Sequence, residues 1–196
     1  GPLASLVKGI KQHILFHLPI EDTNTEAATA ARAYYKRCIA QGEKVVSMVA
    51  AQQLARLYYD NEWEDVIVDY TEIIRVLSNY LRSGEKVTLY RHMLPETYSD
   101  IKAPLFNFEV YFRILRFYSQ MESVSTHWWD ARVKEMKPFL EKSMDDQYDR
   151  LSLLDEIIWF MERSERYKHK VDKWKGIADE IRQHVGEEYE TSEDDE

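Results

Sequence analysis

The sequence predicts an all-α fold, a compact stack or bundle of about eight helices built from antiparallel helical hairpins. Two observations support this class. Apolar residues recur at the i, i+3, i+4, i+7 spacing of amphipathic helices along most of the chain, and no strong strand pattern interrupts them. The 196 residues include only six glycines and five prolines. This depletion favours long helices with short connections over a many-turned β architecture.

A helical hairpin between Gln52 and Leu81 is the clearest element. Two helical patterns follow one another there without glycine or proline, and Asp60 and Asn61 form the turn between them. The second helix carries an apolar stripe at helical spacing. This stripe comprises residues 63, 66, 67, 70, 73, 74, 77, 80 and 81.

The helices of the first half are delimited by recognisable start and stop signals. Pro19 stops a short amphipathic segment, and Thr23 with Glu26 matches a capping box that starts the next helix. Gly42 ends that helix by supplying the left-handed conformation that helix C-termini favour, and Gly84 ends the fourth. The predicted helices of this half cover residues 6–18, 25–40, 43–59 and 62–84.

The middle of the chain begins with a weaker pattern. Pro95 and Pro104 bracket a stretch that we expect to be a structured loop, packed over the core through Tyr98 and Ile101. Residues 105–118 are then apolar nearly all the way round, which indicates a helix at the middle of the core.

The remaining helices are predicted from their caps and breaks. Ser125 or Thr126 caps a helix that contains Pro138, so this helix should bend or break just before the proline. Asp145 or Asp146 caps the next helix. The predicted helices after the central one cover residues 125–142, 146–168 and 171–185.

The chain is predicted to contain one structured region. We expect residues 1–5 to be an expression-tag remnant and residues 6–185 to form a single helical domain, which at this size buries roughly 70% of its unfolded surface. Residues 186–196 hold seven acidic residues and no basic one, which predicts a disordered acidic tail. The alternative is a mobile anionic arm for a basic partner, or a phosphorylation site at Thr191 or Ser192.

Composition and charge limit the partners and the cellular compartment that we expect for this protein. The net charge of −9 disfavours nucleic acid, because an acidic surface repels phosphate backbones. The single cysteine, Cys38, excludes an internal disulfide framework and indicates a reducing compartment. The sequence shows neither a membrane-spanning apolar run nor a signal peptide. We therefore expect an intracellular protein of the nucleus or cytoplasm, with no membrane association and no cofactor.

Residues 50–74 resemble a tetratricopeptide repeat. In that family a first helix with leucine or alanine near its middle carries an aromatic residue one turn later, and a second helix then begins with an aromatic residue. Here the pattern is carried by Leu54, Ala55, Tyr58, Trp63, Val66, Tyr70 and Ile73. The resemblance implies a curved stack of helices with a concave groove that accepts a peptide or a partner helix.

An aspartate-rich run offers one candidate metal site. Asp145, Asp146 and Asp149 match the pattern with which isoprenoid synthases hold magnesium and diphosphate, since magnesium prefers oxygen ligands. The second metal-binding motif of those enzymes is not found in the sequence, and a capping role explains Asp145 and Asp146 better. A magnesium-dependent enzyme is kept as the second alternative function.

Three other groups are interpreted as structural. His13 and His17 are four residues apart and could share a metal, but no glutamate completes an HExxH motif. His127 precedes two tryptophans and is interpreted as a residue beside a helix cap. Cys38 has two basic neighbours in the sequence but no further basic residues nearby, so the sequence does not indicate a reactive thiolate.

The function predicted from these features is a non-enzymatic protein–protein interaction or scaffold module that binds a peptide or helix of a partner protein in a groove between helices. The groove is expected beside the 54–81 hairpin, with exposed aromatic residues as anchors and arginines as charge readers. These partner-binding candidates are Tyr58, Tyr59, Trp63 and Tyr70 together with Arg56, Arg75 and Arg82. The sequence indicates neither the partner's identity nor the oligomeric state.

The first alternative is nucleic-acid binding by the basic and aromatic segment 163–175, where cations would follow phosphates and rings would stack on bases. Glu165 and Asp172 interrupt the run, which favours a solvated helix face or charge balance with the acidic tail. The candidate residues are Arg163, Arg166, Lys168, Lys170, Lys173, Trp174 and Lys175.

Overall fold

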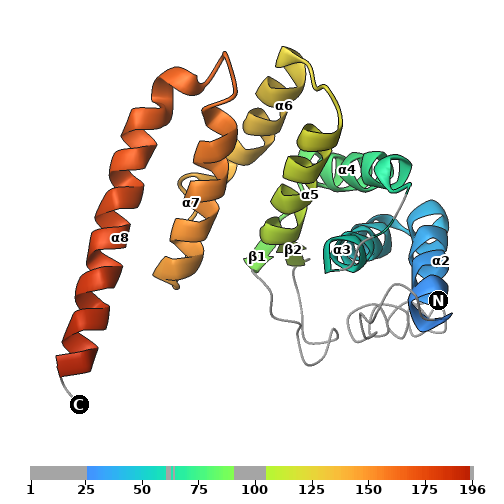
Figure 1. The fold of residues 1–196 in the computed structure, drawn as a ribbon, viewed down its shortest axis with the longest axis horizontal. Helices are drawn as coiled ribbons and strands as arrows, with labels where there is room; N and C mark the ends of the chain where they lie inside the picture. The colour runs from blue at the N-terminus through green and yellow to red at the C-terminus, as the bar shows by residue number, and fades with distance from the viewer. Residues whose placement is uncertain (1–25, 61–62, 64, 91–104, 195–196) are drawn as a thin grey trace. The chain divides into compact units, whose positions relative to one another are not determined.

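The computed structural model describes residues 26–60, 63, 65–90 and 105–194, and this part of the chain is mostly helical (Figure 1). It contains seven α-helices, two short 3-10 helices and one two-stranded parallel sheet. The predicted 6–18 helix, the tag remnant and the Pro95–Pro104 loop lie outside the described residues. No helix within the described ranges is long and apolar enough to cross a bilayer.

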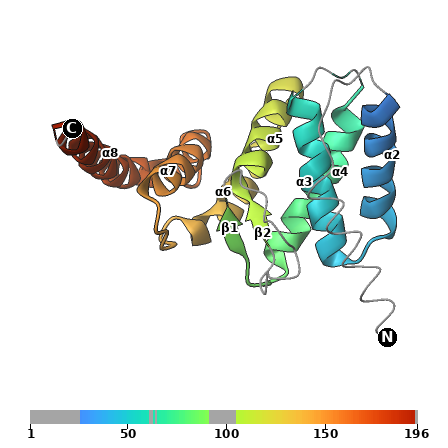
Figure 2. The same ribbon diagram turned by 90° about the horizontal axis from the view of Figure 1, so that it is seen from below.

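The chain divides into two compact units, Gly1–Glu122 and Ser123–Glu196. In the first unit, helices α2 to α5 lie side by side, and α3 packs against α2, α4 and α5 (Figure 2). The elements of the first unit are α2 (Glu26–Gln41), α3 (Lys44–Asp60), α4 (Ile67–Arg82), β1 (Thr88–Tyr90), β2 (Leu105–Asn107) and α5 (Phe108–Met121).

Helices α3 and α4 form the antiparallel hairpin that the sequence predicts. The hydroxyl of Tyr58, near the end of α3, donates a hydrogen bond to Asp69, near the start of α4. At the other end of the pair, Lys44 Nζ lies 3.4 Å from the carboxylate of Glu85. The second helix begins later than expected, because Asp65 adopts a positive φ of 56° that is incompatible with a continuing helix. Trp63 therefore precedes α4.

Helix α3 is at the centre of the first unit, and residues 105–118 also lie in the core, as predicted, since six residues of α5 are buried. Every residue from Met48 to Ala55 is buried, including Gln52 and Gln53. The amide of Asn107 donates a hydrogen bond of 2.5 Å to Gln52 Oε1, which ties α3 to the start of α5. Residues 105–107 are a strand rather than a helix, and they pair in parallel with β1.

Gly42 ends α2 as predicted, but the predicted reason is wrong. A positive φ among the described glycines occurs only at Gly84, beyond the end of α4. Gly42 is instead required by close packing, since a Cβ atom there would lie 2.3 Å from the carbonyl oxygen of Cys38 and 2.9 Å from Val46 Cγ1. Its amide donates a 2.7 Å hydrogen bond to the same Cys38 oxygen.

The second unit confirms the predicted caps and the predicted break. Ser125 caps α6 and Asp146 caps α7 through hydrogen bonds accepted from backbone amides two and three residues further on. Helix α6 ends at Met136, and Pro138 lies in the short 3-10 turn that follows, because proline cannot donate the helical hydrogen bond. The elements are α6 (Thr126–Met136), η2 (Lys137–Phe139), α7 (Gln147–Met161), η3 (Lys168–Lys170) and α8 (Val171–Asp194).

Helices α7 and α8 pack as an antiparallel pair (Figure 1). Two ion pairs show this direction: Lys175 Nζ lies 3.6 Å from Glu162, and Arg182 lies 3.1 Å from Asp155.

Two predicted boundaries need correction. Helix α7 ends at Met161 rather than near Lys168, and α8 continues beyond residue 185 into the segment expected to be a disordered tail. The extension is rich in glutamate, a good helix former, and begins with an i, i+4 hydrogen bond from Gln183 to Glu187.

Candidate functional site

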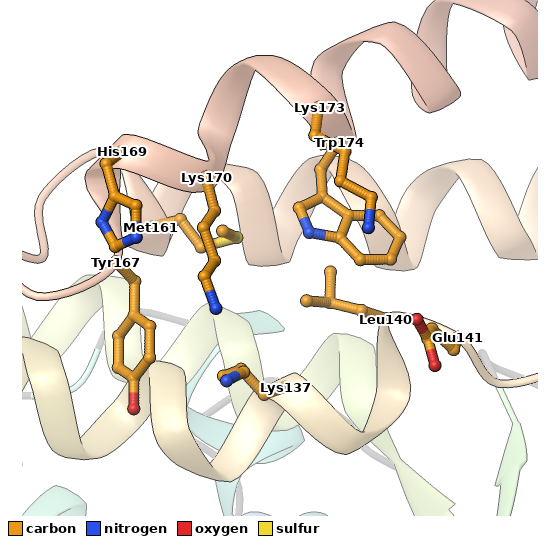
Figure 3. Close-up of a pocket in the computed structure, with 9 residues that line it drawn as sticks. All are labelled: Lys137, Leu140, Glu141, Met161, Tyr167, His169, Lys170, Lys173 and Trp174. Atoms are coloured by element: carbon orange, nitrogen blue, oxygen red, sulfur yellow. The ribbon is translucent and has the colours of Figure 1, made fainter.

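A pocket of about 500 Å³ lies within the second unit, between the turn that follows α6 and the start of α8 (Figure 3). It combines an apolar wall with three lysines. The lining residues are Lys137, Leu140, Glu141, Met161, Tyr167, His169, Lys170, Lys173 and Trp174. A volume of this size lies within the range of ligand sites.

The first side of the pocket exists because Pro138 interrupts the helix. The 3-10 turn η2 redirects the chain after Lys137 and brings Leu140 and Glu141 to the pocket. Arg150 of α7 holds this turn, since its Nη1 atom donates a 3.3 Å hydrogen bond to the carbonyl of Phe139. Burial lowers the pKa of Arg150, and the negative charge of Glu141 opposes this shift.

The second side is built by the turn between α7 and η3. Ser164 is fully buried there, and its hydroxyl donates a 2.6 Å hydrogen bond to Asp130 of α6. The Ser164 carbonyl accepts hydrogen bonds from the amides of Tyr167 and Lys168, at 3.3 and 2.9 Å. The hydrogen bond from Ser164 lowers the pKa of Asp130, which favours the charged carboxylate. These contacts fix the turn that presents Tyr167, His169 and Lys170.

Two of the lysines lie against aromatic rings of the pocket. Lys137 Nζ is 5.1 Å from the centre of the Tyr167 ring, and Lys173 Nζ is 5.1 Å from that of Trp174. Both rings are largely buried, with exposed fractions of 6% and 7%. Ammonium groups at this distance are attracted by the ring face, which limits their freedom. The third lysine, Lys170, extends from η3 toward Lys137 (Figure 3).

The structure separates the seven nucleic-acid candidates into two groups. Three of them, Lys170, Lys173 and Trp174, line the pocket together. The others are engaged elsewhere. Lys168 lies 2.8 Å from Glu165 and Lys175 lies 3.6 Å from Glu162. The Arg163 guanidinium stacks 3.6 Å from the Trp159 ring centre, and that of Arg166 lies 5.6 Å from Tyr167. Three of the seven candidates therefore line the pocket, and the other four contact glutamates or aromatic rings.

The partner-binding residues predicted in the first unit are only partly at the surface. Tyr58 and Tyr70 are each 3% exposed, because the α3–α4 interface encloses them and their rings meet edge to face. They are therefore core residues rather than surface anchors. Arg75 and Arg82 are exposed, but they bond to Glu72 and Asn79 of their own helix. Arg56 is half-buried, and the side chain of Tyr59 lies outside the described residues.

Trp63 belongs to a charged cluster that joins α2, α3 and α4. The Arg32 guanidinium lies 5.0 Å from the Trp63 ring centre and donates 2.7 and 2.8 Å hydrogen bonds to Tyr58 and Asp69. Lys36 Nζ is 3.2 Å from the same carboxylate. Burial raises the pKa of Asp69, but the hydrogen bonds from Tyr58, Arg32 and Lys36 outweigh burial and hold this pKa below its ordinary value. The cluster is interpreted as a structural link between helices.

Among the residues that the structure describes, the metal-binding candidates do not form a site. No group of three histidine, cysteine or acidic side chains within the described ranges is arranged to hold a metal ion. In the aspartate-rich run, the Asp146 carboxylate accepts from the amides of Tyr148 and Asp149, as expected for a cap. Cys38 is a half-buried free thiol, and His127 is exposed at the start of α6. His13 and His17 lie outside the described residues.

Sequence reasoning missed most of the pocket. Lys137, Leu140, Glu141, Met161, Tyr167 and His169 were not among the predicted site residues. Two signals lie near them: Pro138 marks the turn after α6, and the basic and aromatic segment 163–175 contains Tyr167 and His169. Comparisons of the chain with protein-family models, with curated proteins and with solved structures found no match.

Proposed function

We propose that the protein is a non-enzymatic protein-interaction module whose pocket in the second unit binds an acidic segment of a partner protein. The observation that supports this proposal is the convergence of Lys137, Lys170 and Lys173 on one pocket with an apolar wall. Cations at the rim would pair with carboxylates, while Leu140 and Trp174 would bury an apolar part of the same segment. The binding site of this proposal differs from the predicted groove beside α3 and α4.

The distribution of charge favours a short acidic peptide over nucleic acid. A strand of nucleic acid needs a row of cations that follows successive phosphates. In this unit, however, Lys168 and Lys175 are paired with glutamates, so the pocket cations stand as an isolated cluster. The net charge of −9 also opposes a long polyanion more strongly than a short segment.

Charge-matched variants test this proposal. The pocket variant combines K137Q, K170Q and K173Q, and the control combines K134Q, K168Q and K175Q, which removes the same charge from exposed lysines of the same unit outside the pocket lining. Fluorescence anisotropy would measure binding of a labelled, degenerate pool of glutamate-rich peptides that carry one apolar position. We expect the pocket variant to lose about tenfold or more in affinity and the control to lose little.

Two results would overturn the proposal. One is equal weakening by the two triple variants, which would show that only net charge matters. The other is binding of a single-stranded oligonucleotide, but not of the peptide pool, with a steep salt dependence that the pocket variant reduces. Circular dichroism of each variant would verify that the helical fold is retained.

A further inference from the structure

We infer that the group held by the pocket is a phosphorylated side chain of the partner peptide. This inference rests on the proposed function, since it specifies the chemistry of the segment that the pocket binds. It is argued from the charge of the lining, from the position of the lysines and from the apolar wall behind them.

The charge of the lining matches a phosphate better than a carboxylate. The three lysines and Glu141 give the lining a formal charge of +2 with His169 neutral. A phosphomonoester carries about −1.5 to −2 at neutral pH, whereas a single carboxylate carries −1 and would leave one lysine without a counter-charge. A phosphate also offers three acceptor oxygens, one for each ammonium group.

The three lysines line the same pocket. Lys137 and Lys173 are held against the rings of Tyr167 and Trp174, and Lys170 extends toward Lys137 from the opposite side of the pocket (Figure 3). Ring contact reduces the entropy that these flexible side chains lose when they bind an anion. The three lysines therefore reach one pocket from different elements, η2, η3 and α8.

The apolar wall explains why we infer a phosphorylated side chain rather than free phosphate. Leu140, Met161 and the Trp174 ring line the same space, and all three are buried. A volume of about 500 Å³ exceeds what one phosphate group needs, so room remains for the side chain that carries it. The carbon atoms of that side chain would cover the apolar wall while the phosphate meets the lysines.

The test uses the whole chain and four labelled peptide pools of equal length. The pools have random flanking positions around a central phosphotyrosine, tyrosine, phosphoserine or serine. We expect at least one phosphorylated pool to bind about tenfold or more tightly than its unphosphorylated counterpart. This gain should be lost in the K137Q/K170Q/K173Q variant and kept in K134Q/K168Q/K175Q. K137R, which keeps the charge, should bind more tightly than K137Q.

The outcomes separate this inference from the proposed function. Lysine-dependent binding of glutamate-rich peptides, without any gain from phosphorylation, would overturn the inference and leave the proposed function standing. Failure of every peptide pool to bind would overturn both. Lysine-dependent binding of adenosine monophosphate or inorganic phosphate, with no binding of the phosphorylated pools, would show a small-molecule anion site and would also overturn the inference.

Discussion

The Nζ atom of Lys137 lies 5.1 Å from the centre of the Tyr167 ring, although the two residues belong to separate turns of the second unit. Lys137 starts η2 directly after the end of α6 at Met136, whereas Tyr167 immediately precedes η3. Their contact joins the two turns that form the pocket. It also fixes one of the three lysines without neutralising its charge, so the cation stays available to an anionic ligand.

A double-mutant cycle should measure this contact. We expect K137M and Y167L to be coupled by about 0.5–1 kcal/mol in the free energy of unfolding, the range for a cation–π contact whose cation is not fully desolvated. Urea unfolding of wild type, both single variants and the double variant provides the four values. Additive effects within experimental error would show that the two side chains are neighbours without energetic coupling.

Removal of the Ser164 hydroxyl should loosen the pocket turn. In S164A the Asp130 carboxylate loses its 2.6 Å hydrogen bond, so its pKa should rise toward the ordinary value for aspartate. Carbon-detected NMR titration would follow that pKa, and hydrogen–deuterium exchange should become faster at residues 163–170. Unchanged exchange in this segment would mean that other contacts hold the turn.

Two glycine substitutions should have opposite effects on stability. In G42A the new Cβ atom would approach the Cys38 carbonyl oxygen to 2.3 Å, so we expect a loss of about 1–3 kcal/mol as the backbone shifts. In G176A the Cβ atom meets nothing within 4 Å, and replacing a helical glycine should add about 0.5–1 kcal/mol. Thermal and urea unfolding would compare them, and a stable G42A would contradict the role of close packing at the end of α2.

Asp69 should make the stability of the first unit sensitive to acid. Its folded pKa is lowered, so its contribution is fully present above the unfolded pKa of about 3.9 and is lost as the pH falls through the lower folded value. We expect D69N to be about 2 kcal/mol less stable than wild type at pH 7, because hydrogen bonds to a buried charge are lost.

The pH dependence of that difference provides the test for Asp69. Urea unfolding at pH 7, 4 and 2.5 should show the gap between wild type and D69N shrinking at the lowest pH, where the aspartate is also neutral. The gap would stay constant if the carboxylate charge had no role. D65N, which replaces an exposed carboxylate on the turn before α4, serves as a matched control.

Short-range signals predicted much of the fold. The caps at Ser125 and Asp146 and the break at Pro138 depend on residues within one turn of each other, and the structure confirms all three. The strands at 88–90 and 105–107 were missed because three residues are too few to show an alternating pattern. The central position of α3 was missed because glutamines and alanines in its middle do not resemble an apolar core helix.

The pocket could not be predicted from periodicity, because its residues come from two separate turns and from the adjoining ends of α7 and α8. Lys170, Lys173 and Trp174 were noticed as part of a basic and aromatic run. Their proximity to Lys137 depends on the Ser164–Asp130 hydrogen bond and on the turn after Pro138, which are tertiary features. In the first unit, the residues proposed as anchors are aromatic, as residues at binding surfaces often are. An apolar stripe at helical spacing, however, does not show whether an aromatic ring lies in the core or at the surface.

The continuous burial of α3 has a consequence for how the sequence can vary. A helix with one solvent-exposed face accepts many substitutions at its exposed positions, which recur every third or fourth residue. Its tolerance to mutation therefore follows the helical period. Helix α3 offers no such position between Met48 and Ala55. A saturation scan of the chain should therefore find an unbroken intolerant block there, in which even the two glutamines resist exchange for charged residues.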